Sequence, residues 1–385
     1  MVFPKGFLWG AASASYQIEG GVREGGRGES IWDVFSHTPG KVKNGDTGDV
    51  AADSYHRWRE DVALAKEMNL KAYRFSIAWP RIAPDGGTVW NPEGFAYYDT
   101  LVDTLLEEGI QPWATLYHWD LPQALQASGG WQSEETVRSF AAYADKVGRH
   151  FQGRITHWFT FNEPQCFIGL GCGTGEHAPG LRLDTQSLDT CWKNFRLAHD
   201  FAYDILHLID PENQVGLAST GNVFYPDTNK AKDIEAARQL TFALPEGPRT
   251  FSHALALEGN DKLDFIGLNL YHGAPARMGG NGPETVPLPT GFPRTAMGWP
   301  VTPEALEWGT RFLCERYHRP LYVSENGLSC RDWVSVDGQV HDPQRMDFLR
   351  RYIRSLGRAV KHGADVRGYF YWSLIDNFEW AEGYA

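Results

Sequence analysis

The chain has 385 residues, and its hydrophobic fraction of 42% and charged fraction of 22% exclude a disordered polypeptide. Its formal net charge of −12 disfavours binding to nucleic-acid phosphates or to an anionic membrane surface. No apolar run reaches the roughly 18 residues that a transmembrane helix needs, so a membrane protein of that kind is excluded as well.

Short apolar or aromatic segments alternate along the chain with longer amphipathic segments. Strands are predicted over 7–16, 72–79, 111–118, 155–161, 214–219, 264–270, 320–324 and 368–374. Helices are predicted over 53–68, 94–109, 133–150, 187–209, 229–243, 303–317 and 344–362. This alternation indicates βαβ units and a parallel sheet. Eight such units predict an α/β fold of the (β/α)8 TIM barrel type, with residues 1–385 forming one catalytic domain. A doubly wound open sheet is the alternative.

Two of the helix starts carry capping signals. Ser133 can cap a helix whose first turn contains Glu134 and Glu135, where the helix dipole favours negative charge. Thr302 precedes Pro303, which places a cap residue before a proline of the first turn.

Two long segments rich in Gly and Pro, 169–183 and 273–301, follow the fourth and sixth predicted strands. In a barrel they would be loops on the C-terminal face, where active sites are built. The chain ends at Ala385, shortly after the eighth predicted strand. We therefore expect a barrel without the final C-terminal helix, and an uncovered outer side where the last strand meets the first.

Several common types of site are disfavoured. The segment GLGCGTG (169–175) does not fit the G-x-G-x-x-G pattern or a phosphate-binding P-loop, and no G-x-S-x-G nucleophile elbow occurs. No H-E-x-x-H motif or clustered His/Cys set is present, so we expect no metal and no cofactor. The five scattered cysteines include no C-x-x-C pair and are typical of free thiols, which favours a cytoplasmic protein.

Two glutamates stand at matching positions in the predicted barrel. Glu163 in TFNEP follows the fourth strand, and Glu325 in YVSENG follows the seventh. A carboxylate in such apolar surroundings must be held by hydrogen bonds or a cation, or must have a raised pKa. Hydrolysis of a glycosidic bond needs two opposed carboxyl groups, one to protonate the leaving oxygen and one to attack or to activate water. This pair therefore favours a glycoside hydrolase.

Polar and aromatic residues at other strand ends fit a sugar, whose hydroxyls form hydrogen bonds and whose C–H face packs on an aromatic ring. They are Gln17, His118, Trp119, Asp120, Asn269, Tyr271 and the segment 372–380. Arg74 lies inside the second predicted strand and needs an anionic partner there. A carboxylate across the barrel is the expected partner.

These residues stand in motifs that resemble those of glycoside hydrolase family 1, the β-glucosidase family. The motifs are Q-I-E-G, F-S-I-A-W-P-R, H-W-D-L-P, T-F-N-E-P, S-E-N-G and W-S-L-I-D-N-F-E-W, in the order of the family. The resemblance extends from residue 3 to residue 384, almost the whole chain. It implies a (β/α)8 barrel and a retaining mechanism.

The resemblance also implies a role for each matching residue. Glu163 would be the general acid/base and Glu325 the nucleophile, supported by Arg74, Tyr271 and Asn269. The substrate would be bound by Gln17, His118, Trp119, Asn162, Trp299, Trp372, Glu379 and Trp380, with Trp299 on the aglycone side. His177 would lie near the same mouth. We expect Glu325 to have a low pKa because Arg74 is a cation and Tyr271 a donor, and we expect the negative Glu325 to raise the pKa of Glu163.

Two positions depart from the pattern of the family. Gln165 stands where Trp is frequent, and Cys172 where Tyr is common. Both would lie on the aglycone side, so we expect the leaving-group preference to be affected while the chemistry of the glycone is kept.

The function implied is a retaining β-glycosidase that removes the non-reducing terminal β-D-glucosyl residue of small β-glucosides or cello-oligosaccharides through a covalent glycosyl-enzyme intermediate, as in cellulose degradation. Galactose and fucose stay open as glycones, and no oligomeric state is predicted. One alternative is a 6-phospho-β-glycosidase, which Asp376, Glu379 and Glu382 disfavour because these carboxylates would repel a phosphate. Another is a non-catalytic sugar-binding protein.

Overall fold

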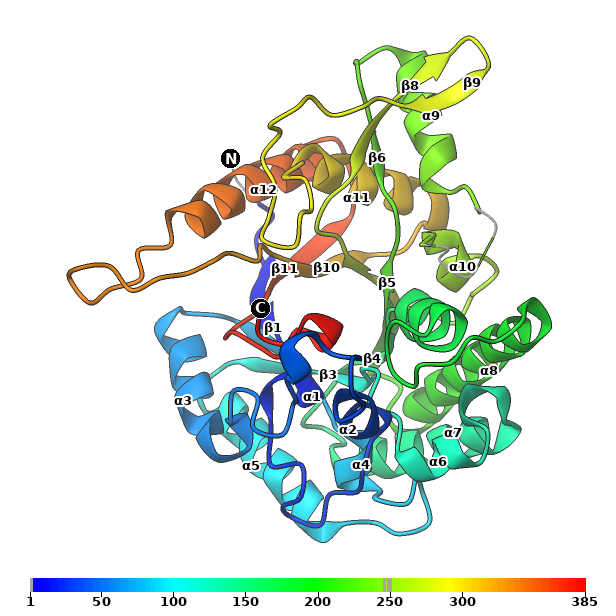
Figure 1. The fold of residues 1–385 in the computed structure, drawn as a ribbon, viewed down its shortest axis with the longest axis vertical. Helices are drawn as coiled ribbons and strands as arrows, with labels where there is room; N and C mark the ends of the chain where they lie inside the picture. Colours follow the sequence, from blue (N-terminus) through cyan, green and yellow to red (C-terminus); the bar gives the residue numbers. More distant parts are fainter. Residues whose placement is uncertain (1–2, 245–246, 248–250) are drawn as a thin grey trace.

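The computed structural model describes residues 3–244, 247 and 251–385. Eight parallel strands form a closed barrel in the order β1-β11-β10-β7-β5-β4-β3-β2 (Figure 1). The strands are β1 (Leu8–Ala12), β2 (Ala72–Ser76), β3 (Gln111–Tyr117), β4 (His157–Asn162), β5 (Gln214–Thr220), β7 (Phe265–Asn269), β10 (Leu321–Asn326) and β11 (Val366–Trp372). Each predicted strand is found, and the closed ring confirms the barrel and excludes the open sheet.

Helices surround the ring of strands, as Figure 1 shows. The predicted ones are α3 (Ser54–Glu67), α5 (Pro92–Glu107), α7 (Glu134–His150), α8 (Thr185–Ile209), α9 (Ala231–Thr241), α11 (Glu304–Tyr317) and α12 (Pro343–Lys361). They form because apolar residues recur at helical spacing: in α7 the buried side chains include Val137, Phe140, Ala144 and Val147. Within the described residues, no helix combines the length and the apolar character needed to span a bilayer.

Short helices between the main elements were not predicted, because one turn leaves too little periodicity to detect. They are α1 (Ser15–Ile18), α2 (Ile31–Ser36), α4 (Trp79–Ile82), α6 (Gln123–Ala127), α10 (His253–Leu257) and the 3₁₀ turns η1 (Lys43–Gly45), η2 (Gly130–Gln132) and η4 (Trp380–Glu382). The first predicted strand was therefore too long, since its last residues belong to α1.

One of the two predicted caps is confirmed. The Ser133 side chain accepts a hydrogen bond from the backbone N–H of Glu135, as expected. The prediction for Thr302 is wrong: its hydroxyl accepts from the backbone N–H of Gly273 and donates to the carbonyl of the same residue. The Thr302 side chain thus holds the loop after β7 by two hydrogen bonds, and the start of α11 has no side-chain cap.

The two long loops contain regular structure. The segment after β4 begins with a π-helix, η3 (Gln165–Thr174). The segment after β7 contains β8 (Ala274–Gly279) and β9 (Gly282–Thr285), which form a small sheet with β6 (Phe224–Pro226). In Figure 1 the β8–β9 hairpin projects beyond the ring of helices.

The barrel interior is filled by large and small side chains from different strands. Trp113 is buried at its centre, with its ring centroid 5.5 Å from that of Phe265 and 5.2 Å from that of Phe370. Ala12, Ala72 and Ala218 complete this layer. The barrel is therefore a packed core that forms a floor, and a binding site must lie above it, at the C-terminal ends of the strands.

The barrel closes where β1 pairs with β11, from Leu8 opposite Gly368 to Ala12 opposite Trp372. In the described residues that follow β11, the chain forms the turn η4 and no α-helix. The outer side of this seam was expected to be uncovered, but Phe3, Phe7 and Trp9 pack together there, and Trp9 contacts the buried Tyr369.

Candidate active site

A cavity of about 1910 Å³ opens above the floor of the barrel. The residues to which the family resemblance gave a catalytic or sugar-binding role line it, except Arg74, which lies wholly buried underneath; Asp120, also named from the sequence, is buried beside Ser15 and does not line it. The lining includes Gln17, His118, Trp119, Asn162, Glu163, Asn269, Tyr271, Trp299, Glu325, Trp372, Glu379 and Trp380, and also His177. They converge because they stand at or after the carboxyl ends of parallel strands, which meet at one face of a barrel.

Glu325 lies on β10 and is almost completely buried. Its Oε1 accepts a hydrogen bond from Nη1 of Arg74 at 2.7 Å, and its Oε2 accepts one from the hydroxyl of Tyr271 at 2.7 Å. The Nε of Arg74 donates to the hydroxyl of Thr115, which fixes the plane of the guanidinium. The anionic partner expected for Arg74 is therefore Glu325, and the arrangement favours its ionised form.

Glu163 follows β4 and adopts a left-handed backbone conformation, with φ of 43°. Such a conformation is costly for a residue with a Cβ and is found mostly where the surroundings impose it. Its Oε1 accepts a hydrogen bond from Nδ2 of Asn269 at 2.8 Å, and its Oε2 accepts one from the thiol of Cys166 at 3.1 Å. Both carboxylate oxygens are thus held by neutral donors.

One hydrogen-bond network joins the two glutamates. Nη2 of Arg74 donates to Oδ1 of Asn162 at 2.7 Å, and Nδ2 of Asn269 donates to the same oxygen at 3.0 Å. The hydroxyl of Ser324 donates to Oδ1 of Asn269 at 2.7 Å, so the amide of Asn269 has one orientation, with its N–H groups toward Glu163 and Asn162. Side chains from four strands therefore fix the position of the pair.

The two glutamates differ in proton affinity. Burial, and then the negative charge of Glu325, raise the pKa of Glu163 to about 8. The expectation of a low pKa for Glu325 is wrong, because burial raises its pKa, with Arg74 and Tyr271 opposing that effect. Arg74 contacts Glu325 directly whereas Glu163 has only neutral donors, and this arrangement favours the proton of the pair on Glu163.

Polar side chains form another part of the wall. Nε2 of Gln17 donates to the carbonyl of Phe378 at 2.9 Å, and Nδ2 of Asn377 donates to Oε2 of Glu379 at 2.8 Å. Oε1 of Gln17 and Nδ1 of His118 are buried without a protein partner. Burial raises the pKa of Glu379 to about 7. Buried polar atoms without partners are suited to hydrogen bonds with a polar ligand.

Aromatic rings enclose the same space. The rings of Trp119 and Trp380 lie 4.5 Å apart, and Trp372 stacks on His118 at 5.9 Å. Nε1 of Trp119 donates to the carbonyl of Asn162, which orients its ring. Trp299 belongs to the long loop after β7, and its ring packs against Tyr271 at 5.3 Å.

Sequence reasoning missed two residues that contact this network, Cys166 and Ser324. Cys166 carried no signal, because its contact with Glu163 depends on the π-helix and on the left-handed turn before it. Gln165 and Cys172, expected on the aglycone side, do not line the cavity. The amide of Gln165 donates to Ser219 and to the carbonyl of Ser252, behind the wall.

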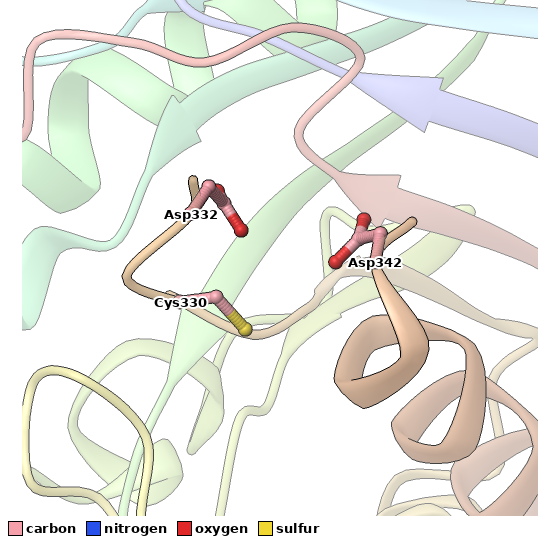
Figure 2. Close-up of side chains that lie close together, drawn as sticks. All are labelled: Cys330, Asp332 and Asp342. Carbon is pink, nitrogen blue, oxygen red and sulfur yellow. The ribbon is translucent and has the colours of Figure 1, made fainter. Parts of the chain in front are cut away.

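A second group of ligand-type side chains lies in the loop between β10 and α12, where Cys330, Asp332 and Asp342 come together (Figure 2). Sequence spacing did not indicate this cluster. The guanidinium of Arg345 pairs with Asp332 at 2.8 Å and with Asp342 at 3.0 Å. One arginine therefore offsets the charge of one of the two aspartates, and the cluster is an ion-pair network.

Cleavage of a glycosidic bond requires a proton donor and a second carboxylate. The barrel offers such a pair at the face where barrel enzymes carry their sites, within a wall of polar groups and tryptophans suited to a sugar. The fold and the site together define a glycoside hydrolase.

Comparisons with known proteins agree with this class. The family model described as glycosyl hydrolase family 1 matches residues 1–260 and 256–385. The chain is 42% identical over its whole length to β-glucosidase A of Thermotoga maritima, covering 91% of that protein, and 41% identical to a 1,4-β-D-glucan glucohydrolase of Thermotoga neapolitana, covering 96%. The T. maritima β-glucosidase solved with glucoimidazole superposes with a TM-score of 0.87 at 41% identity, over 99% of this chain and 92% of that one. The chain belongs to glycosyl hydrolase family 1.

Proposed function

We propose that this enzyme is a retaining β-glucosidase that removes the non-reducing terminal β-D-glucosyl residue of small β-glucosides or cello-oligosaccharides. The observation that carries the proposal is the unequal pair, with Glu325 bound to Arg74 and Tyr271 and with Glu163 held by neutral donors. The β-glucosidases among its relatives support the glycone, and the T. maritima enzyme has been solved with deoxynojirimycin and with glucoimidazole.

In the first step, the ionised Glu325 attacks the anomeric carbon of the sugar. The bond from that carbon to the leaving oxygen breaks, and Glu163 gives its proton to this oxygen. The aglycone departs as an alcohol, and the glucosyl group is bound covalently to Glu325. Arg74 and Tyr271 keep Glu325 ionised and aligned for the attack.

In the second step, Glu163 acts as the base. Glycosylation removes the negative charge of Glu325, which was the second cause of the raised pKa of Glu163. The pKa of Glu163 then falls, and its carboxylate takes a proton from a water molecule. The water oxygen attacks the anomeric carbon, the bond to Glu325 breaks, and glucose leaves with its configuration retained.

The polar wall would bind the hydroxyls of the glycone. We assign this role to Gln17, His118, Asn162, Glu379 and Trp380, with Trp119 and Trp372 packing around the sugar. Oε1 of Gln17 and Nδ1 of His118, which lack protein partners, would gain partners from those hydroxyls. The ring of Trp299, on the outer loop, would support the aglycone.

The test is release of nitrophenol from the p-nitrophenyl β-glucoside, β-galactoside and β-glucoside-6-phosphate. We expect cleavage of the unphosphorylated glucoside. Glu379 in the wall disfavours the phosphorylated sugar because two anions would face each other. Cleavage of only the phosphorylated sugar would establish the 6-phospho-β-glycosidase instead. Sugar binding by the folded protein without any cleavage would establish the non-catalytic alternative.

A further inference from the structure

Cys166 contacts the acid/base residue and has no role in the mechanism above. It is the second residue of η3, and its thiol lies 3.1 Å from Oε2 of Glu163. Its backbone N–H donates to the carbonyl of Glu163 at 2.9 Å, so the turn that carries Glu163 also places the thiol. The side chain is 6% exposed and lines the cavity.

The two oxygens of Glu163 have partners of different character. Oε1 faces the amide of Asn269, which Ser324 holds in one orientation, so that this partner can only donate. Oε2 faces a thiol, which can rotate and act as a weak donor or a weak acceptor. Glu163 has to be protonated in the first step and ionised in the second, and only Oε2 has a partner that tolerates both states.

We propose that Cys166 is a positioning residue for Glu163, because its thiol donates to Oε2 when Glu163 is ionised and turns away when that oxygen carries the proton. This inference rests on the function proposed above and adds a determinant of when the acid/base releases its proton. Loss of the thiol removes a donor that favours the ionised form. A stronger donor at the same place favours that form further.

The charged and titratable groups around Glu163 come from several elements. Glu325 faces it from β10, Arg74 from β2 and Cys166 from η3. Tyr271 interacts with both glutamates, and Glu379 interacts with Glu325. Burial and then the neighbouring Glu163 raise the pKa of the Cys166 thiol well above its ordinary value, so the thiol keeps its hydrogen throughout the range in which Glu163 titrates. Substitution of Cys166 leaves the other groups in place.

The experiment compares Cys166→Ser with Cys166→Ala. The basic limb of kcat/KM against pH reports the proton of Glu163 in the free enzyme, and phenyl β-glucoside is a substrate whose poor leaving group needs that proton. We expect the limb to move down by about half a pH unit to one unit in Cys166→Ser, because a hydroxyl is the stronger donor. We expect a similar upward shift in Cys166→Ala.

Cys172→Ser and Cys172→Ala are the matched controls. Cys172 is a buried cysteine of the same π-helix with no contact to Glu163, and its thiol pairs with Cys191. Its variants should keep the wild-type limb, while thermal unfolding shows that each protein is folded. If Cys166→Ala does not fold, the inference is tested by comparing the basic limb of the pH profile of Cys166→Ser with that of Cys172→Ser.

Opposite shifts of the two Cys166 variants support the inference. It is overturned if both limbs coincide with that of the wild type, or if both move in the same direction, because packing alone would then explain them. A wild-type protein that cleaves no aryl β-glucoside at any pH would refute the proposed function itself, and the inference with it.

Discussion

Replacement of Arg74 by Met tests the ionisation of Glu325 most directly. An adjacent arginine lowers the pKa of a carboxyl group by about 1–3 units, and each unit corresponds to about 1.4 kcal/mol. Nη1 of Arg74 lies 2.7 Å from Glu325, and both side chains are buried, so this effect is expected in full. On the acidic side of the profile, kcat/KM should then fall by about 10- to 1000-fold.

The assay is kcat/KM for p-nitrophenyl β-glucoside against pH, together with thermal unfolding. In Arg74→Met the acidic limb should move up by about 1–3 pH units, because Glu325 ionises only at higher pH. Removing one partner of a buried pair also costs about 3–5 kcal/mol of stability at pH 7. In Arg74→Lys the limb should move less, because the charge is kept while the fork of hydrogen bonds is lost.

Arg81→Met is the matched control. Arg81 is also wholly buried and pairs with a buried carboxylate, Glu19, at 3.0 Å, but neither residue lines the cavity. We expect a similar loss of stability with an unchanged acidic limb. If the limb of Arg74→Met stays in place while activity falls equally at every pH, Arg74 acts only on geometry and the electrostatic explanation is refuted.

Three further predictions concern the carboxylates. In Glu325→Gly, the rate of hydrolysis should fall almost to zero, and azide or formate should partly restore turnover by entering the space of the lost carboxylate. Absence of this rescue would show that Glu325 is not the nucleophile. Wild-type kcat/KM should decline as pH rises through about 8, because Glu163 loses its proton there, and Glu163→Gln should abolish this decline. The same variant should slow hydrolysis of phenyl β-glucoside far more than that of dinitrophenyl β-glucoside, whose good leaving group does not need a proton. Equal slowing of both substrates would argue against Glu163 as the general acid. The pKa of about 7 of Glu379 predicts that KM rises as pH falls through 7, because the carboxylate becomes protonated. Glu379→Gln should have a high KM that does not depend on pH in this range. If KM of the variant depends on pH as in the wild type, Glu379 does not bind the sugar.

The barrel and the strand-end residues around its cavity could be predicted from strong patterns, whereas Asn162 and Trp299 were named only from the family resemblance. Apolar strands and amphipathic helices alternate, and parallel strands place their carboxyl ends at one face. Glu163 and Glu325, far apart in sequence, therefore had to approach each other. Asn269, the last residue of β7, was predicted at the same face because it ends a parallel strand.

The contacts that could not be predicted depend on local geometry. The thiol of Cys166 reaches Glu163 through a π-helix, whose spacing differs from the pattern of hydrophobic residues used to detect helices. Thr302 had the sequence context of a cap, but a tertiary contact with Gly273 uses its hydroxyl. The pKa of Glu325 depends on the balance between burial and Arg74, and the extent of burial is visible only in the structure.

From the seam between β1 and β11 we expect an order in which the parts of the active site form during folding. Gln17 donates to the carbonyl of Phe378 across 361 residues of chain, whereas the bond between Glu163 and Asn269 spans 106. During synthesis, β1 emerges first and waits for β11 as an exposed strand edge, a state prone to wrong pairing. Contacts of such long range form slowly, so the sugar-binding wall should be completed after the acid/base network. The appearance of activity during refolding would therefore report closure of the ring.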